Sequence, residues 1–204
     1  MPIIELTNVH FSRTFSGSGV YYTNSDASTY IVDSVLPGST SGNKSLRITW
    51  NENVSIRWTV GNPIINFGSN IRIGIAVKYV NPNFLEVGKR AEAGIFIGNI
   101  SAGVGVMRVS TDYQFYVFLK RNTNVLVSNQ ISPSFFEQIF LRQETNQILF
   151  YYSFSNSNTK NLINSFSAST TLASGQAGFF LFTEDKTSGT VFFDYFFVEQ
   201  FTSA

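Results

Sequence analysis

The chain lacks cysteine altogether and contains a single histidine, His10. The first absence excludes a disulfide-stapled scaffold and a thiolate metal site. The second means that any histidine-dependent nucleophile would rest wholly on His10, and no G-x-S-x-G motif accompanies it. His10 lies between Val9 and Phe11, a setting typical of a structural strand residue.

Charged residues are also scarce. They make up 13% of the 204 residues, and the net charge is +1, whereas an average soluble protein has about 25% charged residues. Asn, Ser and Thr take their place. Nucleic acids and anionic membranes bind clustered Lys and Arg, so a neutral surface of this kind offers them no attractive field. We therefore expect no nucleic-acid partner.

Long apolar runs are missing too. No stretch approaches the ~20 residues that a membrane span requires, so we expect no membrane span. The first residues, MPIIELTNVHF, include an acid at Glu5 and lack a basic region, and no apolar region ends in a small-residue cleavage site. No export signal is visible. We expect a free-standing module, and we expect many of its 21 phenylalanines to lie in the interior.

What the sequence does contain is period-two alternation. Residues 71–79 alternate apolar and other side chains, and residues 92–100 are almost continuously apolar, as in a central strand covered on both faces. The Asn-Pro-Asn at 81–83 predicts the end of the first of these strands. Helix signals are nearly absent; residues 132–141, opening with Ser132-Pro133, predict one short 3₁₀ turn.

The second half repeats the strand pattern in seven further stretches bounded by Asn, Ser, Gly or Thr. Residues 12–44, with short apolar pieces at Val20–Tyr22 and Tyr30–Val32, predict loops and an edge strand. Ten or more short strands with so little helix predict an all-β fold of two stacked antiparallel sheets, a β-sandwich or jelly roll. No composition break divides the chain, so we expect residues 1–204 to form a single domain.

The stretch 45–60, SLRITWNENVSIRWTV, holds both tryptophans. Its alternation predicts a hairpin that turns at 51–53 and points Trp50 and Trp58 into the core; the alternative is a sugar-stacking platform. The same register places Arg47 opposite Arg57 on the other face. Like charges across a strand pair are unfavourable, so either neighbouring carboxylates separate them or the pair binds an anionic ligand.

Residues 139–157, IFLRQETNQILFYYSFSNS, read as a strand, a two-residue turn and an aromatic strand. Residues 174–201, SGQAGFFLFTEDKTSGTVFFDYFFVEQF, add a Gly-led strand, a loop and a terminal aromatic strand. With AEAGIFIGN at 91–99, this arrangement resembles the concanavalin A-like sandwiches found as laminin-G-type modules and as accessory domains of glycoside hydrolases. The resemblance implies a two-sheet sandwich. Those domains often carry an Asp-Gly turn and a tryptophan where this chain has SFSNSNTKNLI, so no sugar site is carried over from that edge.

Catalytic members of that fold cluster carboxylates at alternate positions of one strand, and no Glu-x-Asp-x-Glu occurs here. The nearest pair, Asp194 and Glu199, has opposite parity, which predicts opposite faces and no shared glycosidic bond. We therefore expect no enzyme. Glu184 and Asp185 are adjacent in a loop and offer oxygens to a calcium ion, as an alternative to a solvated turn; no other cofactor is expected.

The candidate glycan-binding residues are exposed aromatics, each of which has the alternative of a partly buried place in a sheet: Tyr22, Tyr113, Tyr116 and Tyr151. Sequons mark Asn43, Asn53 and Asn99 as candidate glycosylation sites.

A charge-poor, cysteine-free sandwich without a visible export signal favours a non-catalytic surface component of a virion or another extracellular assembly. Its partners would be copies of itself or other assembly proteins, and its location the virion or extracellular surface. A carbohydrate-binding, lectin-like module is the second hypothesis and a polysaccharide-active enzyme the third.

Overall fold

A computed structural model shows an all-β architecture and describes residues 9–10, 28–33, 45–51, 54–59, 71–132, 137–144, 147–154, 161–167 and 177–200. These residues form fourteen strands, in chain order β1 (Val9–His10), β2 (Ser28–Asp33), β3 (Ser45–Asn51), β4 (Val54–Thr59), β5 (Ile71–Leu85), β6 (Arg90–Ile97), β7 (Ile100–Val109), β8 (Asp112–Arg121), β9 (Asn124–Ile131), β10 (Glu137–Glu144), β11 (Gln147–Phe154), β12 (Asn161–Ser167), β13 (Ala177–Thr183) and β14 (Thr187–Gln200). In this part of the chain no helix has the length and apolar character needed to cross a lipid bilayer.

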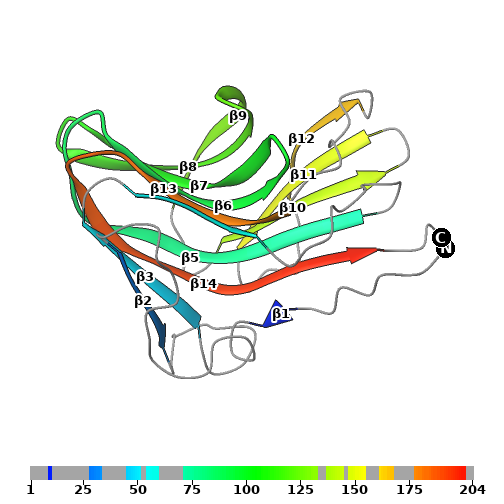
Figure 1. The fold of residues 1–204 in the computed structure, drawn as a ribbon. Coiled ribbons are helices and arrows are strands. Elements are labelled where there is room, and N and C mark those ends of the chain that lie inside the picture. The colour runs from blue at the N-terminus through cyan, green and yellow to red at the C-terminus, as the bar shows by residue number, and fades with distance from the viewer. Residues whose placement is uncertain are drawn as a thin grey trace.

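The strands form two sheets that stack as layers (Figure 1). The eight-stranded sheet has the order β12-β11-β10-β5-β14-β3-β2, with β1 beside β14, and the six-stranded sheet has the order β4-β13-β6-β7-β8-β9. Neighbouring strands are antiparallel throughout the described segments. The predicted antiparallel β-sandwich of jelly-roll type is confirmed.

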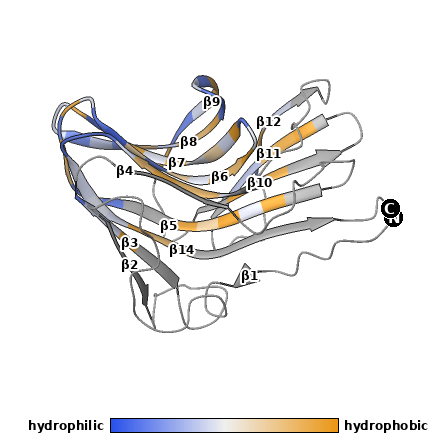
Figure 2. Ribbon diagram, in the orientation of Figure 1, coloured by the Kyte–Doolittle hydropathy of each residue, from blue (hydrophilic) through white to orange (hydrophobic). Residues whose placement is uncertain are grey.

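The main core lies between the sheets, and period-two alternation explains which residues fill it. In β6, Ala91, Ala93, Ile95 and Ile97 point inward, while the residues between them point to the outer face of the six-stranded sheet. The opposing sheet supplies apolar side chains from β5, β10 and β11, Ile75 among them. Figure 2 colours parts of these three strands as hydrophobic. One face of the six-stranded sheet therefore packs in the core, and the other is its outer face.

Two local predictions are confirmed. Strand β6 is buried along nearly its whole length, as its almost continuously apolar character predicts. An edge strand was expected within residues 12–44, and β2 lies at the edge of the eight-stranded sheet.

The predicted hairpin over residues 45–60 is wrong. Strand β3 pairs with β14 and β2 in the eight-stranded sheet, whereas β4 pairs with β13 in the six-stranded sheet. The chain crosses from one sheet to the other between Asn51 and Val54. Alternation does not distinguish this crossing from a hairpin, because two strands that face the same core show the same alternation whether or not they are hydrogen-bonded to each other. Trp50 is buried as predicted, at 0% exposure; the side chain of Trp58 lies outside the described residues.

One predicted strand boundary is also wrong. Strand β5 continues through Asn81-Pro82-Asn83 to Leu85, and its register with β14 shifts between Ser188 and Gly189 and again between Thr190 and Phe192. Irregular pairing of this kind tolerates a residue such as Pro82, which has no N–H to donate. The strand predicted from residue 139 is confirmed as β10, while residues 133–136 of the predicted 3₁₀ turn lie outside the described residues.

Candidate functional site

The outer face of the six-stranded sheet carries a second apolar cluster. Phe96, Phe118 and Phe180 are buried there, and Tyr116 and Phe182 pack against them. Phe180 and Phe118 stand at the two ends of the cross-strand row Phe180-Gly94-Gly103-Phe118. Three strand spacings of about 4.8 Å separate them, yet their ring centroids lie 6.3 Å apart.

The two glycines explain that approach. A Cβ atom on Gly94 would lie 2.1 Å from the Ala102 carbonyl oxygen, and one on Gly103 would lie 2.2 Å from the Ala93 carbonyl oxygen. Neither position accommodates a side chain, so the space above β6 and β7 is left to the rings of Phe118 and Phe180 from the flanking strands.

The next cross-strand row on this face is Glu92-Gly105-Tyr116-Gln130. Here too an aromatic ring lies over a glycine, but the ring belongs to a tyrosine and reaches a carboxylate. A Cβ atom on Gly105 would lie 2.4 Å from the Tyr116 ring, so the ring occupies the space above that glycine. From there the Tyr116 hydroxyl donates a hydrogen bond of 2.8 Å to Glu92 Oε1. Burial, followed by the adjacent Glu92 carboxylate, raises the pKa of the Tyr116 phenol well above its usual range.

Glu92 also accepts from a buried cation. Lys120 Nζ donates to Glu92 Oε1 at 2.6 Å and also to Oε2. Glu92 is 3% exposed and Lys120 8%, so the ion pair is held away from solvent. The ammonium lies 4.6 Å from the centroid of the Phe118 ring, within the range of a cation–π contact.

Arg90 completes the charged network at the start of β6. Its Nε lies 3.3 Å from Glu184 Oε1 and 3.8 Å from Glu92 Oε1. The Arg90 backbone N–H donates to Glu184 Oε2 at 3.0 Å, which holds this carboxylate beside the guanidinium. Arg90 Nε itself is buried without a hydrogen bond of good geometry.

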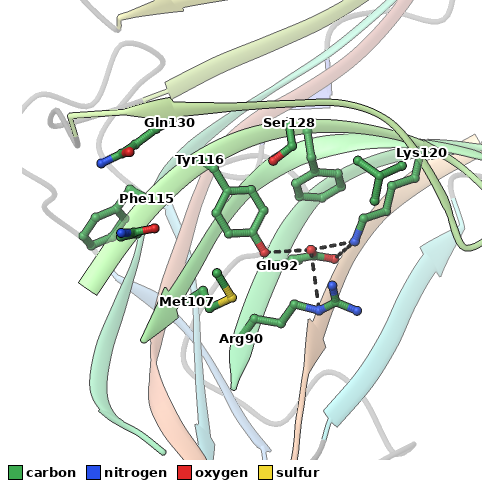
Figure 3. Close-up of a pocket in the computed structure, with 11 residues that line it drawn as sticks. Arg90, Glu92, Met107, Phe115, Tyr116, Lys120, Ser128 and Gln130 are labelled. Carbon is green, nitrogen blue, oxygen red and sulfur yellow. Dashed lines mark hydrogen bonds and ion pairs between the residues drawn. The ribbon is translucent and has the colours of Figure 1, made fainter. Parts of the chain in front are cut away.

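A pocket of about 330 Å³ on the outer face is lined by five of these residues: Arg90, Glu92, Tyr116, Phe118 and Lys120. Figure 3 shows Tyr116, Lys120 and Arg90 converging on Glu92. Neutral hydrogen-bonding side chains stand around the charged network: Gln114 on β8, and Ser128 and Gln130 on β9. Met107, Phe115 and Val125 add apolar surface. An enclosure of this size with a few convergent polar groups is typical of a small-molecule site.

Of the three described tyrosines that were predicted to bind glycans, only Tyr116 lines this pocket. Tyr113 lies on the same strand at 37% exposure, outside the pocket. Tyr151 is half-buried on β11 of the other sheet. Tyr22 lies outside the described residues.

The predicted calcium residues are occupied by basic partners. Glu184 contacts Arg90, and Asp185 accepts a 2.6 Å hydrogen bond from Lys89 Nζ. Within the described ranges no three His, Cys, Asp or Glu side chains gather as a cation site. The hydrogen bond with Lys89 lowers the pKa of Asp185 below its ordinary value and raises that of Lys89.

The predicted juxtaposition of Arg47 and Arg57 is wrong. Arg47 is paired with Phe192 and Ile31 in the eight-stranded sheet, and Arg57 is paired with Phe180 in the other sheet. Because the chain crosses between the sheets after Asn51, the two arginines are not cross-strand neighbours. Their side chains lie outside the described residues.

The separation of Asp194 from Glu199 rests on unbroken alternation, and that premise is wrong. The register between β14 and β5 shifts between Phe193 and Tyr195, so Asp194 falls where the alternation is interrupted. Among the sequon asparagines, Asn99 is exposed in the β6–β7 turn, where its carbonyl accepts from the Asn122 N–H at 2.7 Å. Asn43 and Asn53 lie outside the described residues.

Sequence reasoning missed Arg90, Glu92 and Lys120. The available signal was a charged residue within a strand that is otherwise apolar, at Glu92 in AEAGIFI and at Lys120 in YVFLK. Such residues are almost never fully buried unless paired. The pairing itself joins strands two places apart in the sheet, and local sequence does not encode that relationship.

No family model matches the chain, and no curated protein matches it in sequence. Solved structures are similar in fold. A GH131 β-glucanase catalytic domain from Podospora anserina is 9% identical, with 100% of this chain and 93% of that chain covered and a TM-score of 0.55. At this identity the likeness shows a shared β-sandwich fold.

Two further structures are similar at lower scores. The CBM2 module of the evolved Dit of Lactobacillus casei BL23 phage J-1 is 10% identical, with 99% of this chain and 90% of that chain covered and a TM-score of 0.47. The Bacteroides ovatus xyloglucan PUL GH43B is 6% identical, with a TM-score of 0.44; 85% of this chain is covered, and the chain spans 33% of that protein's length.

Proposed function

We propose that this protein is a non-catalytic carbohydrate-binding module of the concanavalin A-like type, with its site at the Tyr116 pocket. The observation that carries the proposal is the placement of Tyr116. Its ring lies over Gly105 and is tethered to Glu92, and the amides of Gln114 and Gln130 and the hydroxyl of Ser128 stand around the same pocket.

The chemistry of sugars suits this arrangement. A pyranose presents an apolar face of C–H groups and a rim of hydroxyls, so it requires an aromatic surface beside neutral donors and acceptors. A tethered ring loses little side-chain entropy when a ligand binds, which favours affinity. The fold likeness to a β-glucanase catalytic domain is compatible with this proposal.

The engagement of the carboxylates supports a binding role over a hydrolytic one. Glycoside hydrolysis uses one carboxylic acid that donates a proton and a second carboxylate that acts as a base or nucleophile. Glu92 accepts from both Lys120 and Tyr116, and Glu184 is paired with Arg90. Both carboxylates are thus engaged by partners within the protein, and neither stands free beside the pocket to act on a glycosidic bond.

A glycan array followed by isothermal titration calorimetry tests the proposal. We expect binding to at least one oligosaccharide, and we expect Tyr116→Ala to weaken it at least tenfold. Gln130→Ala changes an exposed residue and leaves the buried network intact. We expect this variant to bind the same oligosaccharide severalfold more weakly. Tyr113→Ala is the matched control, since it removes the same side chain from the same strand outside the pocket, and its affinity should equal that of the wild type. An empty array with folded protein contradicts the proposal.

A role in a virion or extracellular assembly is the second candidate, and the edge strand β9 favours it. This strand has no charged residue or proline, and Val125 and Leu126 are 52% and 44% exposed. Natural edge strands usually carry such features to prevent pairing with other chains. Light scattering after size-exclusion chromatography is expected to show an oligomer in this case, and a strict monomer at high concentration would contradict it.

A further inference from the structure

The charges that line the Tyr116 pocket are neutralised within the protein. Glu92 is bound by Lys120, and Arg90 contacts Glu184 and Glu92. The remaining described residues around the pocket are polar but neutral or apolar. Among the described residues, the two cations of the pocket are thus paired with Glu92 in the pocket and with Glu184 beside it.

The residues beside the pocket show the same balance. Lys89 contacts Asp185 at 2.6 Å, and Lys186 contacts Glu86 at 3.1 Å. The whole chain has a net charge of +1. A net charge this small gives the chain as a whole little long-range attraction for a polyanion.

We infer, on the basis of the proposed function, that the pocket selects uncharged oligosaccharides and discriminates against those built from uronic acids. The ligand hydroxyls would bind to the Gln114, Gln130 and Ser128 side chains and to the terminal nitrogens of Arg90. Those two nitrogens form no hydrogen bond with the described part of the chain. They are therefore donors available to a ligand hydroxyl that reaches Arg90.

The carboxylates beside Arg90 are the reason for discrimination. A ligand carboxylate that reached the Arg90 guanidinium would also approach Glu184, which lies 3.3 Å from its Nε, and Glu92, which lies 3.8 Å away. Repulsion between like charges opposes that approach, and it is stronger in a partly desolvated pocket than in water. A sugar hydroxyl accepts from Arg90 without this opposition.

Titration calorimetry on the full chain with four probes tests the inference: cellohexaose, xylohexaose, mannohexaose and hexagalacturonate. We expect at least one neutral hexamer to bind at least tenfold more tightly than hexagalacturonate. We also expect its affinity to change less than twofold between about 50 mM and about 500 mM sodium chloride, because no charged ligand group is screened.

The possible failures are distinguishable. Hexagalacturonate binding as tight as that of every neutral hexamer, with affinity falling as salt increases, overturns the inference and leaves the proposed function intact. No binding of any probe, together with an empty glycan array, overturns the proposed function and the inference with it.

A matched pair of variants isolates the cause. Glu184→Gln keeps an acceptor for the Arg90 backbone N–H and removes the negative charge beside the guanidinium, so the preference for neutral over acidic hexamers should narrow at least fivefold. Asp185→Asn removes the charge of the next residue, which is paired with Lys89 outside the pocket, and the preference should stay unchanged. An unchanged preference in Glu184→Gln overturns the inference.

Discussion

The Tyr116 hydroxyl donates a 2.8 Å hydrogen bond to Glu92 although strand β7 lies between the strands that carry them. The bond exists because the intervening position is Gly105, which leaves room for the ring to lie across β7. The candidate site is therefore a property of three strands together. Its integrity depends on Gly105 as much as on Tyr116, because the ring can reach Glu92 only across that glycine.

Gly105→Ala tests this dependence. The added methyl group would occupy the position of the Tyr116 ring, so the ring must move and its bond to Glu92 is lost. Because the displaced atoms are at the free end of a side chain, we expect a stability loss of about 1–2 kcal/mol by urea denaturation. Glycan affinity should fall as far as in Tyr116→Ala.

Gly103→Ala is the companion to that variant. Here the new methyl group meets the backbone of β6 at Ala93, which cannot swing aside. We expect a stability loss of about 3 kcal/mol or more. Equal losses of stability in the two variants would contradict the distinction between a displaced ring and a strained backbone.

Lys120→Met tests the buried ion pair. The substitution leaves the Glu92 carboxylate buried without its cation, for which we expect a destabilisation of about 3–5 kcal/mol in chemical denaturation. The double variant Glu92→Leu/Lys120→Met removes both charges and should be more stable than Lys120→Met alone.

Lys89→Met is the control for that experiment, because it removes a lysine from a solvent-exposed pair with Asp185. Exposed ion pairs contribute little, so no measurable change in the denaturation midpoint is expected. A Lys120→Met variant as stable as this control would contradict the buried-pair interpretation.

Alkaline pH offers a third test. The pKa of Tyr116 is raised in the folded protein by burial and by Glu92, whereas in the unfolded chain it is about 10. Above that pH the unfolded chain releases a proton that the folded protein keeps, so the free energy of unfolding falls as pH increases. The stabilisation is complete below about pH 10 and is lost as pH rises toward the folded-state pKa. Chemical denaturation of the wild type and of Tyr116→Phe at pH values from about 8 to about 11 spans the pKa of the unfolded chain. The free energy of unfolding should decline more steeply with pH in the wild type, and parallel declines would contradict this assignment.

Trp50 provides a prediction for the core. Its indole N–H donates to Thr187 Oγ1 at 3.3 Å, and this hydroxyl donates in turn to the Glu184 carbonyl at 2.6 Å. Thr187→Val leaves both buried groups without a partner, for which we expect a stability loss of about 1–3 kcal/mol. Thr190→Val is the control at a half-buried position of the same strand, where the expected loss is within about 0.5 kcal/mol.

Much of the fold follows from local sequence, as particular strands show. The almost continuously apolar stretch at 92–100 predicts a central strand, and β6 is one. Alternation predicts that Trp50 points inward, and its exposure is 0%. The 45–60 stretch shows the limit of this reasoning, because alternation predicts which face a residue occupies and leaves open which strand lies beside it.

The same limit applies to the candidate site. The sequence marked Tyr116 as a glycan-binding candidate, and the structure places it in the pocket. It did not mark Glu92 or Lys120, which lie 28 residues apart and meet across β7.

By itself, the sequence determined that this protein is an all-β sandwich with a neutral exterior, because the two-residue period of a strand and the scarcity of charge are local properties of the chain. Only the tertiary structure decided that Arg90, Glu92, Tyr116 and Lys120 form one network around a pocket. Strand order and register arise from pairings between distant segments, and those pairings are selected by the packing of the whole core.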